Sequence, residues 1–128
     1  MPYAKRTVTF LDRQESVALL DAPDRSTWVG RRDYAILLVA LQTGLRVSEL
    51  ISLRCKDVVL GTGAHIRCDG KGRKERCTPL RRDTVELLEQ WLTERRGGND
   101  QPLFPTMRGE RLSRDALEHL VRKHSLVA

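Results

Sequence analysis

Long apolar runs, paired cysteines and nucleotide-binding glycine motifs are all missing from this sequence of 128 residues. No stretch approaches the ~20 consecutive apolar residues that a membrane-crossing helix needs. Residues 1–6 lack the apolar core of a secretory signal. The three cysteines are an odd number without a C-x-x-C spacing, so we expect free thiols in a reducing cytoplasm. These absences argue against membrane proteins and against disulfide-stabilised secreted proteins.

Metal and nucleotide cofactors are also not indicated. His65, Cys68 and Cys77 could supply three zinc ligands, but the sequence offers no evident fourth one. The only glycine-flanked lysine does not belong to a G-x-x-x-x-G-K-[ST] loop, which is the phosphate-binding loop of many nucleotide-dependent enzymes. We therefore expect no metal and no nucleotide cofactor.

Positive charge is what the sequence has in excess. It contains 23 Lys and Arg against 17 Asp and Glu, which gives a net charge of +6 and an isoelectric point of about 9.7. This balance favours a polyanionic partner, nucleic acid first, although many basic domains only carry a basic surface. With 40% hydrophobic and 31% charged residues, the chain is long enough for one folded domain with its own core.

The spacing of apolar residues predicts a mainly helical α+β domain in which a three-stranded antiparallel meander packs beside a helical core. We expect residues 1–8 to be a linker and residues 9–128 to form the domain. Asp12 and Glu15 predict the capped start of a first helix at 11–20. A polar loop should occupy 22–30 and an extended, partly buried connector 102–105. Further helices are predicted at 31–42, after Gly44, at 83–95 and from Ser113 to about His124, with strands at 56–60, 64–68 and 74–80.

The first motif with chemical content is Thr-Gly-Leu-Arg-Val-Ser-Glu-Leu at residues 43–50. Gly44 can adopt a positive φ without strain, so it predicts the end of the long apolar helix. Arg46 then lies at the start of a short helix, where a guanidinium is well placed to hold a phosphate oxygen. Glu49 follows three residues later, on the same side of that helix. The alternative is an ordinary Arg46–Glu49 ion pair on a solvated surface.

The second motif is the turn Gly-Lys-Gly-Arg-Lys-Glu-Arg at residues 70–76, between the second and third predicted strands. Seven basic residues and two acidic ones lie between Arg67 and Arg82. Glycines allow a tight turn and a close approach of backbone to another surface. Lys71 at the tip could reach a phosphate or donate a proton. The alternative is a flexible hairpin whose charges serve solubility or protect a sheet edge.

The two motifs together resemble those of the tyrosine recombinases, the phage-integrase family, and the resemblance covers nearly the whole chain. It implies that Arg46 grips the scissile phosphate, that Glu49 orients groups of the active site, and that Lys71 protonates the leaving 5′-oxygen. In this family a tyrosine attacks the phosphodiester and forms a 3′-phosphotyrosyl link, without metal or ATP. The implied partners are double-stranded DNA and further recombinase protomers, and the implied location is the bacterial cytoplasm, at the nucleoid. DNA contacts are predicted for Thr43, Arg73, Lys74 and Arg76.

The sequence departs from the family pattern in its last part. After the helix predicted here from Ser113 to about His124, members continue with a His-x-x-Arg box and a tyrosine nucleophile, and neither follows that helix here. Tyr3 and Tyr34 do not match the position of the nucleophile. His119 does precede Arg122 by three residues, but both lie within the predicted helix and not after it, and His124 has no arginine three residues later. We therefore predict an incomplete catalytic domain that does not cleave DNA alone. Two alternatives remain: a DNA-binding relic or regulator without catalysis, and an interaction module completed by a partner chain.

Overall fold

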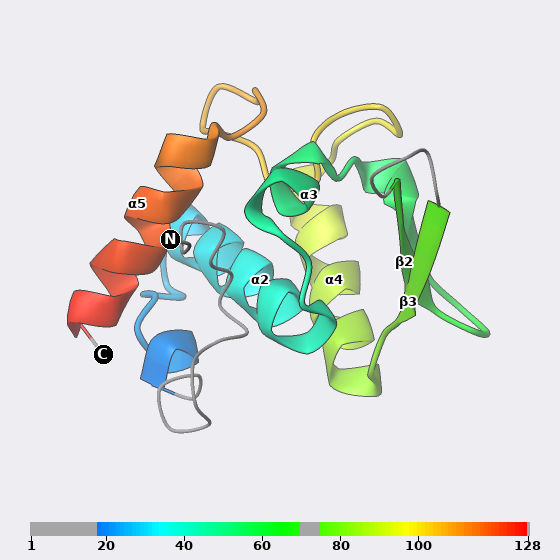
Figure 1. The fold of residues 1–128 in the computed structure, drawn as a ribbon, viewed down its shortest axis with the longest axis horizontal. Helices are drawn as coiled ribbons and strands as arrows, with labels where there is room; N and C mark the ends of the chain where they lie inside the picture. Colours follow the sequence, from blue (N-terminus) through cyan, green and yellow to red (C-terminus); the bar gives the residue numbers. More distant parts are fainter. Residues whose placement is uncertain (1–17, 70–74, 128) are drawn as a thin grey trace, which may run out of the picture.

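The computed structural model of the chain describes residues 18–69 and 75–127 (Figure 1). The predicted linker at 1–8 and the predicted cap at Asp12 and Glu15 lie outside these residues. Residues 18–21 are helical. The elements that follow are α2 (Trp28–Thr43), α3 (Val47–Ser52), the 3-10 turn η2 (Cys55–Asp57), β1 (Val58–Val59), β2 (His65–Asp69), β3 (Glu75–Pro79), α4 (Arg82–Arg95) and α5 (Arg114–Val127). The predicted mainly helical α+β fold with one small sheet is confirmed.

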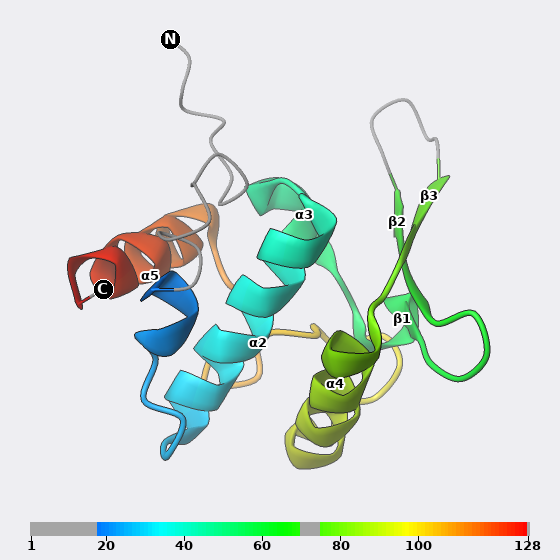
Figure 2. The ribbon, with the colours of Figure 1, turned by 90° about the horizontal axis from the view of Figure 1, so that it is seen from below.

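Helix α2 is the centre of the core, as its nearly continuous apolar sequence predicts. It buries Ala35, Ile36, Leu37, Val39 and Ala40. Helix α4 packs against α2, and α5 packs against α3. Figures 1 and 2 place the sheet beside α4, at the end of the molecule opposite α5. In the described part of the chain, no helix combines the length and the apolar character that crossing a membrane requires.

The sheet has the strand order β1-β2-β3, with both pairs antiparallel. The turn between β1 and β2 is formed with two glycines, Gly61 (φ 97°) and Gly63 (φ 71°), which both adopt left-handed backbone. The predicted first strand at 56–60 is wrong in extent: only Val58–Val59 pair with β2. The cause is local, since the Asp57 carboxylate accepts a hydrogen bond from the Arg54 N–H at 2.8 Å and closes a 3-10 turn there.

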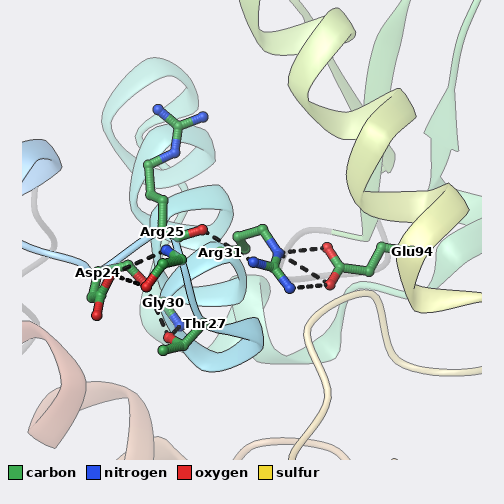
Figure 3. Close-up of polar contacts among 7 residues, drawn as sticks. Asp24, Arg25, Thr27, Gly30, Arg31 and Glu94 are labelled. Atoms are coloured by element: carbon green, nitrogen blue, oxygen red, sulfur yellow. Dashed lines mark hydrogen bonds and ion pairs between the residues drawn. The ribbon is translucent and has the colours of Figure 1, made fainter.

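The start of α2 corrects the prediction of a polar loop at 22–30, because the helix already begins at Trp28 (Figure 3). The Thr27 hydroxyl oxygen accepts a hydrogen bond from the Gly30 N–H at 2.9 Å and donates to the Asp24 carbonyl oxygen at 3.0 Å. The Thr27 N–H donates to the same carbonyl at 3.1 Å. A threonine cap therefore ends the loop at residue 27.

The connector before α5 is less extended and more buried than predicted for 102–105, since it bends at residues 103 and 104 and residues 103–105 are all buried. Leu103 is fully buried, and its N–H donates to the Leu53 carbonyl at 2.9 Å. The Trp91 indole N–H donates to the Leu103 carbonyl at 2.8 Å, which ties α4 to the connector. Trp28 lies against Trp91, with ring centroids 5.5 Å apart and planes tilted by 44°.

A partly exposed ion pair joins α2 to α4. The Arg31 guanidinium donates to both carboxylate oxygens of Glu94, with Nη2–Oε2 at 2.6 Å and Nε–Oε1 at 2.9 Å (Figure 3). The Arg31 hydrogen bonds lower the pKa of Glu94, and they outweigh desolvation, which acts in the opposite direction. The pair therefore makes a contribution to stability that depends on pH.

We expect the Glu94→Gln variant to unfold at a slightly lower urea concentration than the parent at neutral pH. Because the folded-state pKa of Glu94 is lowered, the stabilisation is complete above the ordinary glutamate pKa of about 4.3 and is lost as the pH falls through the lower folded value. Urea midpoints of both proteins, measured across this range, should converge in acid. A difference that persists there would contradict the assignment.

Candidate functional site

A sharp corner between α2 and α3 presents Arg46 to solvent. Gly44 ends α2 with a left-handed backbone (φ 73°), and its N–H donates to the Ala40 carbonyl at 2.9 Å, as the sequence predicts. Thr43 supports the corner: its hydroxyl donates to the Val39 carbonyl at 2.7 Å and accepts from the Leu45 N–H at 3.3 Å. The chain then leaves in an extended conformation at Arg46 and enters α3.

Glu49 fixes the backbone of Arg46 and leaves its side chain available. Glu49 Oε1 accepts a hydrogen bond from the Arg46 N–H at 2.8 Å, as a residue one turn into a helix can do. The alternative of an Arg46–Glu49 ion pair is wrong, because Glu49 contacts the backbone and not the guanidinium. Arg46 is exposed, and its guanidinium makes no ion pair with any other residue that the structure describes.

The predicted lysine hairpin is located by the strands that flank it. Strands β2 and β3 pair from His65↔Pro79 to Asp69↔Glu75. Figure 2 shows the ends of β2 and β3 that lead into this turn on the same side of the molecule as the α2–α3 corner. Lys71, Arg73 and Lys74 lie outside the described residues, and so does the side chain of Arg76. Their contacts with DNA remain predictions.

A groove of about 680 Å³ runs beside α3, and sequence reasoning did not find it. It is bounded by α3, by η2, by β2 and by the segments around residues 100 and 111. Four of its lining residues are basic: Arg54, Lys56, Arg67 and Arg111. Because these residues come from separate stretches of the chain, only the folded structure brings them together.

The Asp100 carboxylate balances part of the positive charge that lines the groove. Asp100 Oδ1 lies 3.0 Å from Lys56 Nζ and 3.7 Å from Arg54 Nη1. The hydrogen bond from Lys56 lowers the pKa of Asp100, and the charges of Lys56 and Arg54 act in the same direction. Asp57 also lines the groove, but its carboxylate is engaged by the Arg54 N–H.

A buried polar network joins the start of α2 to the end of α5, and it too was missed from the sequence. Asp33 accepts two hydrogen bonds from Arg32, at 2.8 and 3.0 Å, through one oxygen. Its other oxygen lies 2.8 Å from His124 Nε2. Arg32 also donates to the Pro105 carbonyl at 3.1 Å. Asp33 is 1% exposed and His124 is 4% exposed, so His124 belongs to the packing of α5.

The cysteines and histidines show no sign of a metal centre within the described ranges. No group of three or more His, Cys, Asp or Glu residues in 18–69 and 75–127 could hold a metal ion. Cys55 and Cys68 are buried, Cys77 is exposed, and none of them forms a disulfide. His65 Nδ1 lies 2.9 Å from the Gly63 carbonyl, in the turn before β2.

Comparison with known proteins supports the resemblance seen in the two motifs. The sequence pattern of the phage integrase family matches residues 9–126. The chain is 53% identical over 126 residues to the integrase/recombinase y4rC of Sinorhizobium fredii. This match covers 98% of the present chain and 38% of y4rC. It is 40% identical over 123 residues to the tyrosine recombinase XerD of Pseudomonas putida. That match covers 92% of this chain and 41% of XerD.

Solved recombinase structures share the fold. The XerA recombinase superposes with a TM-score of 0.75 at 29% identity, over 91% of this chain and 40% of that one. XerH bound to its difH substrate before cleavage superposes with a TM-score of 0.71 at 29% identity, over 98% and 39%. The chain thus spans about two fifths of the length of the relatives it matches. Because the family pattern covers nearly all of the chain, the protein belongs to the phage integrase family of tyrosine recombinases.

Proposed function

We propose that this chain is the arginine-bearing part of the catalytic domain of a site-specific recombinase, and that it binds the backbone of double-stranded DNA at the α2–α3 corner. The observation that carries the proposal is the exposed Arg46 guanidinium, which projects from a backbone held by Glu49 and Gly44. A fixed backbone with a free cationic side chain suits the binding of one phosphate at a defined position.

In the complete recombinase, Arg46 contacts the non-bridging oxygens of the scissile phosphate and stabilises their charge as the phosphorus becomes pentavalent. A tyrosine oxygen attacks the phosphorus while the bond to the 5′-oxygen breaks, and Lys71 gives that oxygen a proton. Glu49 is a positioning residue, because it acts on the backbone of Arg46. The reverse attack by a 5′-hydroxyl of a partner strand restores the phosphodiester, so bond energy is conserved and no ATP is consumed.

The 128 residues supply only part of these groups. Tyr34 lies within α2 with the Arg25 guanidinium 3.9 Å from its ring centroid, which leaves it in a structural role. A nucleophile from the rest of the recombinase, together with further protomers, would complete the reaction at a cytoplasmic, nucleoid-associated DNA site. We therefore expect this chain to bind DNA and not to cut it. A covalent protein–DNA adduct formed with a nicked substrate would contradict this expectation.

DNA binding by the 128-residue chain should depend strongly on salt. The logarithm of the association constant should fall with the logarithm of salt concentration, by roughly 0.9 for each phosphate contacted. We expect Arg46→Gln and Lys71→Gln each to flatten this slope and to weaken binding by about tenfold, the size of one charge-assisted hydrogen bond. Fluorescence anisotropy with a labelled duplex measures both quantities.

Lys123→Gln is the matched control, because Lys123 is exposed on α5 and its substitution removes the same charge. If this variant weakens binding as much as Arg46→Gln does, the affinity reports net charge and not a site at the corner. Neutral changes at Lys74 and Arg76 test the hairpin separately. An unchanged salt slope in those variants would remove the hairpin from the contact surface.

A further inference from the structure

The basic groove beside α3 begins at the proposed phosphate site. Glu49 lines the groove, and the same side chain accepts the hydrogen bond from the Arg46 N–H. A DNA strand held at Arg46 therefore has the groove directly beside it. Further along, the groove is lined by Arg54 and Lys56 near η2, by Arg67 on β2 and by Arg111 before α5.

The position between Arg54 and Lys56 already holds an anionic oxygen, which comes from the protein itself. Asp100 Oδ1 lies within 3.0 Å of the Lys56 ammonium and 3.7 Å of the Arg54 guanidinium. The arrangement is close to that of a phosphate oxygen held by two cations. The side chain of Asp100 is nevertheless 77% exposed, so an outside anion can reach both cations.

The loop that carries Asp100 is held by its backbone, independently of this ion pair. The Lys56 N–H donates to the Asn99 carbonyl at 3.0 Å, and the Gln101 N–H donates to the Gly98 carbonyl at 3.0 Å. The Gln101 side chain also accepts from the Gly98 N–H at 3.1 Å. Exposed ion pairs contribute little to stability. The Asp100 carboxylate can therefore give way to a competing anion without loss of the loop.

We propose that this groove is a second contact for the DNA backbone, and that Asp100 acts as an internal anion that competes with a DNA phosphate for Lys56 and Arg54. The inference rests on the proposed function, since it extends the DNA path away from Arg46. It makes Asp100 an autoinhibitory group: its carboxylate shields two cations until a phosphate displaces it. Removal of that carboxylate should then strengthen DNA binding.

The Asp100→Asn variant tests this directly, because the amide keeps the shape of the side chain and removes its charge. We expect several-fold tighter binding of a labelled duplex and a salt slope steeper by up to roughly 0.9, the value of one added phosphate contact. The control is Glu89→Gln, since Glu89 is exposed on α4, outside the groove, and makes the same change of net charge. Equal gains in both variants would overturn the proposal.

A second substitution assigns the gain to the groove. In the Asp100→Asn background, Lys56→Gln should return the affinity and the salt slope to about the parent values, and a gain that survives this change would overturn the proposal. The groove proposal and the proposed function would be contradicted by different results. If Arg46→Gln weakens binding while Asp100→Asn behaves like Glu89→Gln, only the groove is refuted. If neither the parent nor Asp100→Asn binds DNA, the proposed function falls and the groove with it.

Discussion

Replacing Asp33 by asparagine is expected to destabilise the fold by about 3–5 kcal/mol, the usual result of breaking a buried ion pair from one side. Asp33 is 1% exposed, and its two oxygens serve Arg32 and His124 separately. An asparagine has only one accepting oxygen, so one of the two partners faces an N–H donor. Arg32 is then left in the interior without a counter-charge. Urea unfolding followed by the fluorescence of Trp28 and Trp91 measures the loss.

Glu94→Gln is the matched control for this change. It also converts a carboxylate that binds an arginine into an amide, but the side chains of Arg31 and Glu94 are 40% and 31% exposed. Water replaces the lost partner there, so the effect should be a small fraction of that at Asp33. Equal effects of the two substitutions would mean that burial does not govern the network.

A double-mutant cycle separates the His124 contact from the rest of the network. Asp33→Asn and His124→Gln should be less damaging together than the sum of the two single changes, because both alter the same 2.8 Å contact. Additive effects would show that His124 and Asp33 act independently. In either case the destabilisation should appear as weaker docking of α5 on α2, which faster hydrogen exchange in α5 would reveal.

The network also marks a limit of sequence reasoning. The core of α2 could be predicted because its apolar residues recur over one continuous segment, and Gly44 could be predicted because one residue type suits a left-handed helix end. The Asp33–His124 contact joins residues 91 positions apart. No local pattern signals such a pair, so the sequence does not predict it.

Hydrogen bonds from side chains to nearby backbone groups explain why the predicted ends of some helices and strands were wrong. Asp57 carries a side chain that can bind the backbone three residues earlier, and this turn replaced the first part of a predicted strand. The polar loop predicted for 22–30 ends at Thr27, which caps α2. The sequence did not indicate this end, because the residue types that cap helices are also common in loops. The groove could not be predicted at all, since the four basic residues that line it come from separate stretches of the chain.

Gly30→Ala is expected to cost about 1–3 kcal/mol of stability, although alanine is the better helix former. A Cβ at residue 30 would lie 1.7 Å from the Asp24 carbonyl oxygen and 2.9 Å from the Thr27 hydroxyl oxygen. The methyl group must therefore displace the loop over the start of α2. Overpacking of this kind costs about 1–3 kcal/mol, and loss of a threonine cap about 1 kcal/mol more. The gain of about 1 kcal/mol in helix propensity offsets only part of this.

Gly98→Ala provides the control, because a Cβ at residue 98 would meet no heavy atom within 4 Å. That substitution should leave the urea midpoint within the small range of surface changes. A Gly30→Ala protein as stable as Gly98→Ala would show that the 24–27 loop yields at little cost. The loop would then not determine where α2 begins. Since α2 carries Asp33 near its start and the Arg46 corner at its end, loss of the cap should also weaken the contact with α5 and reduce DNA affinity.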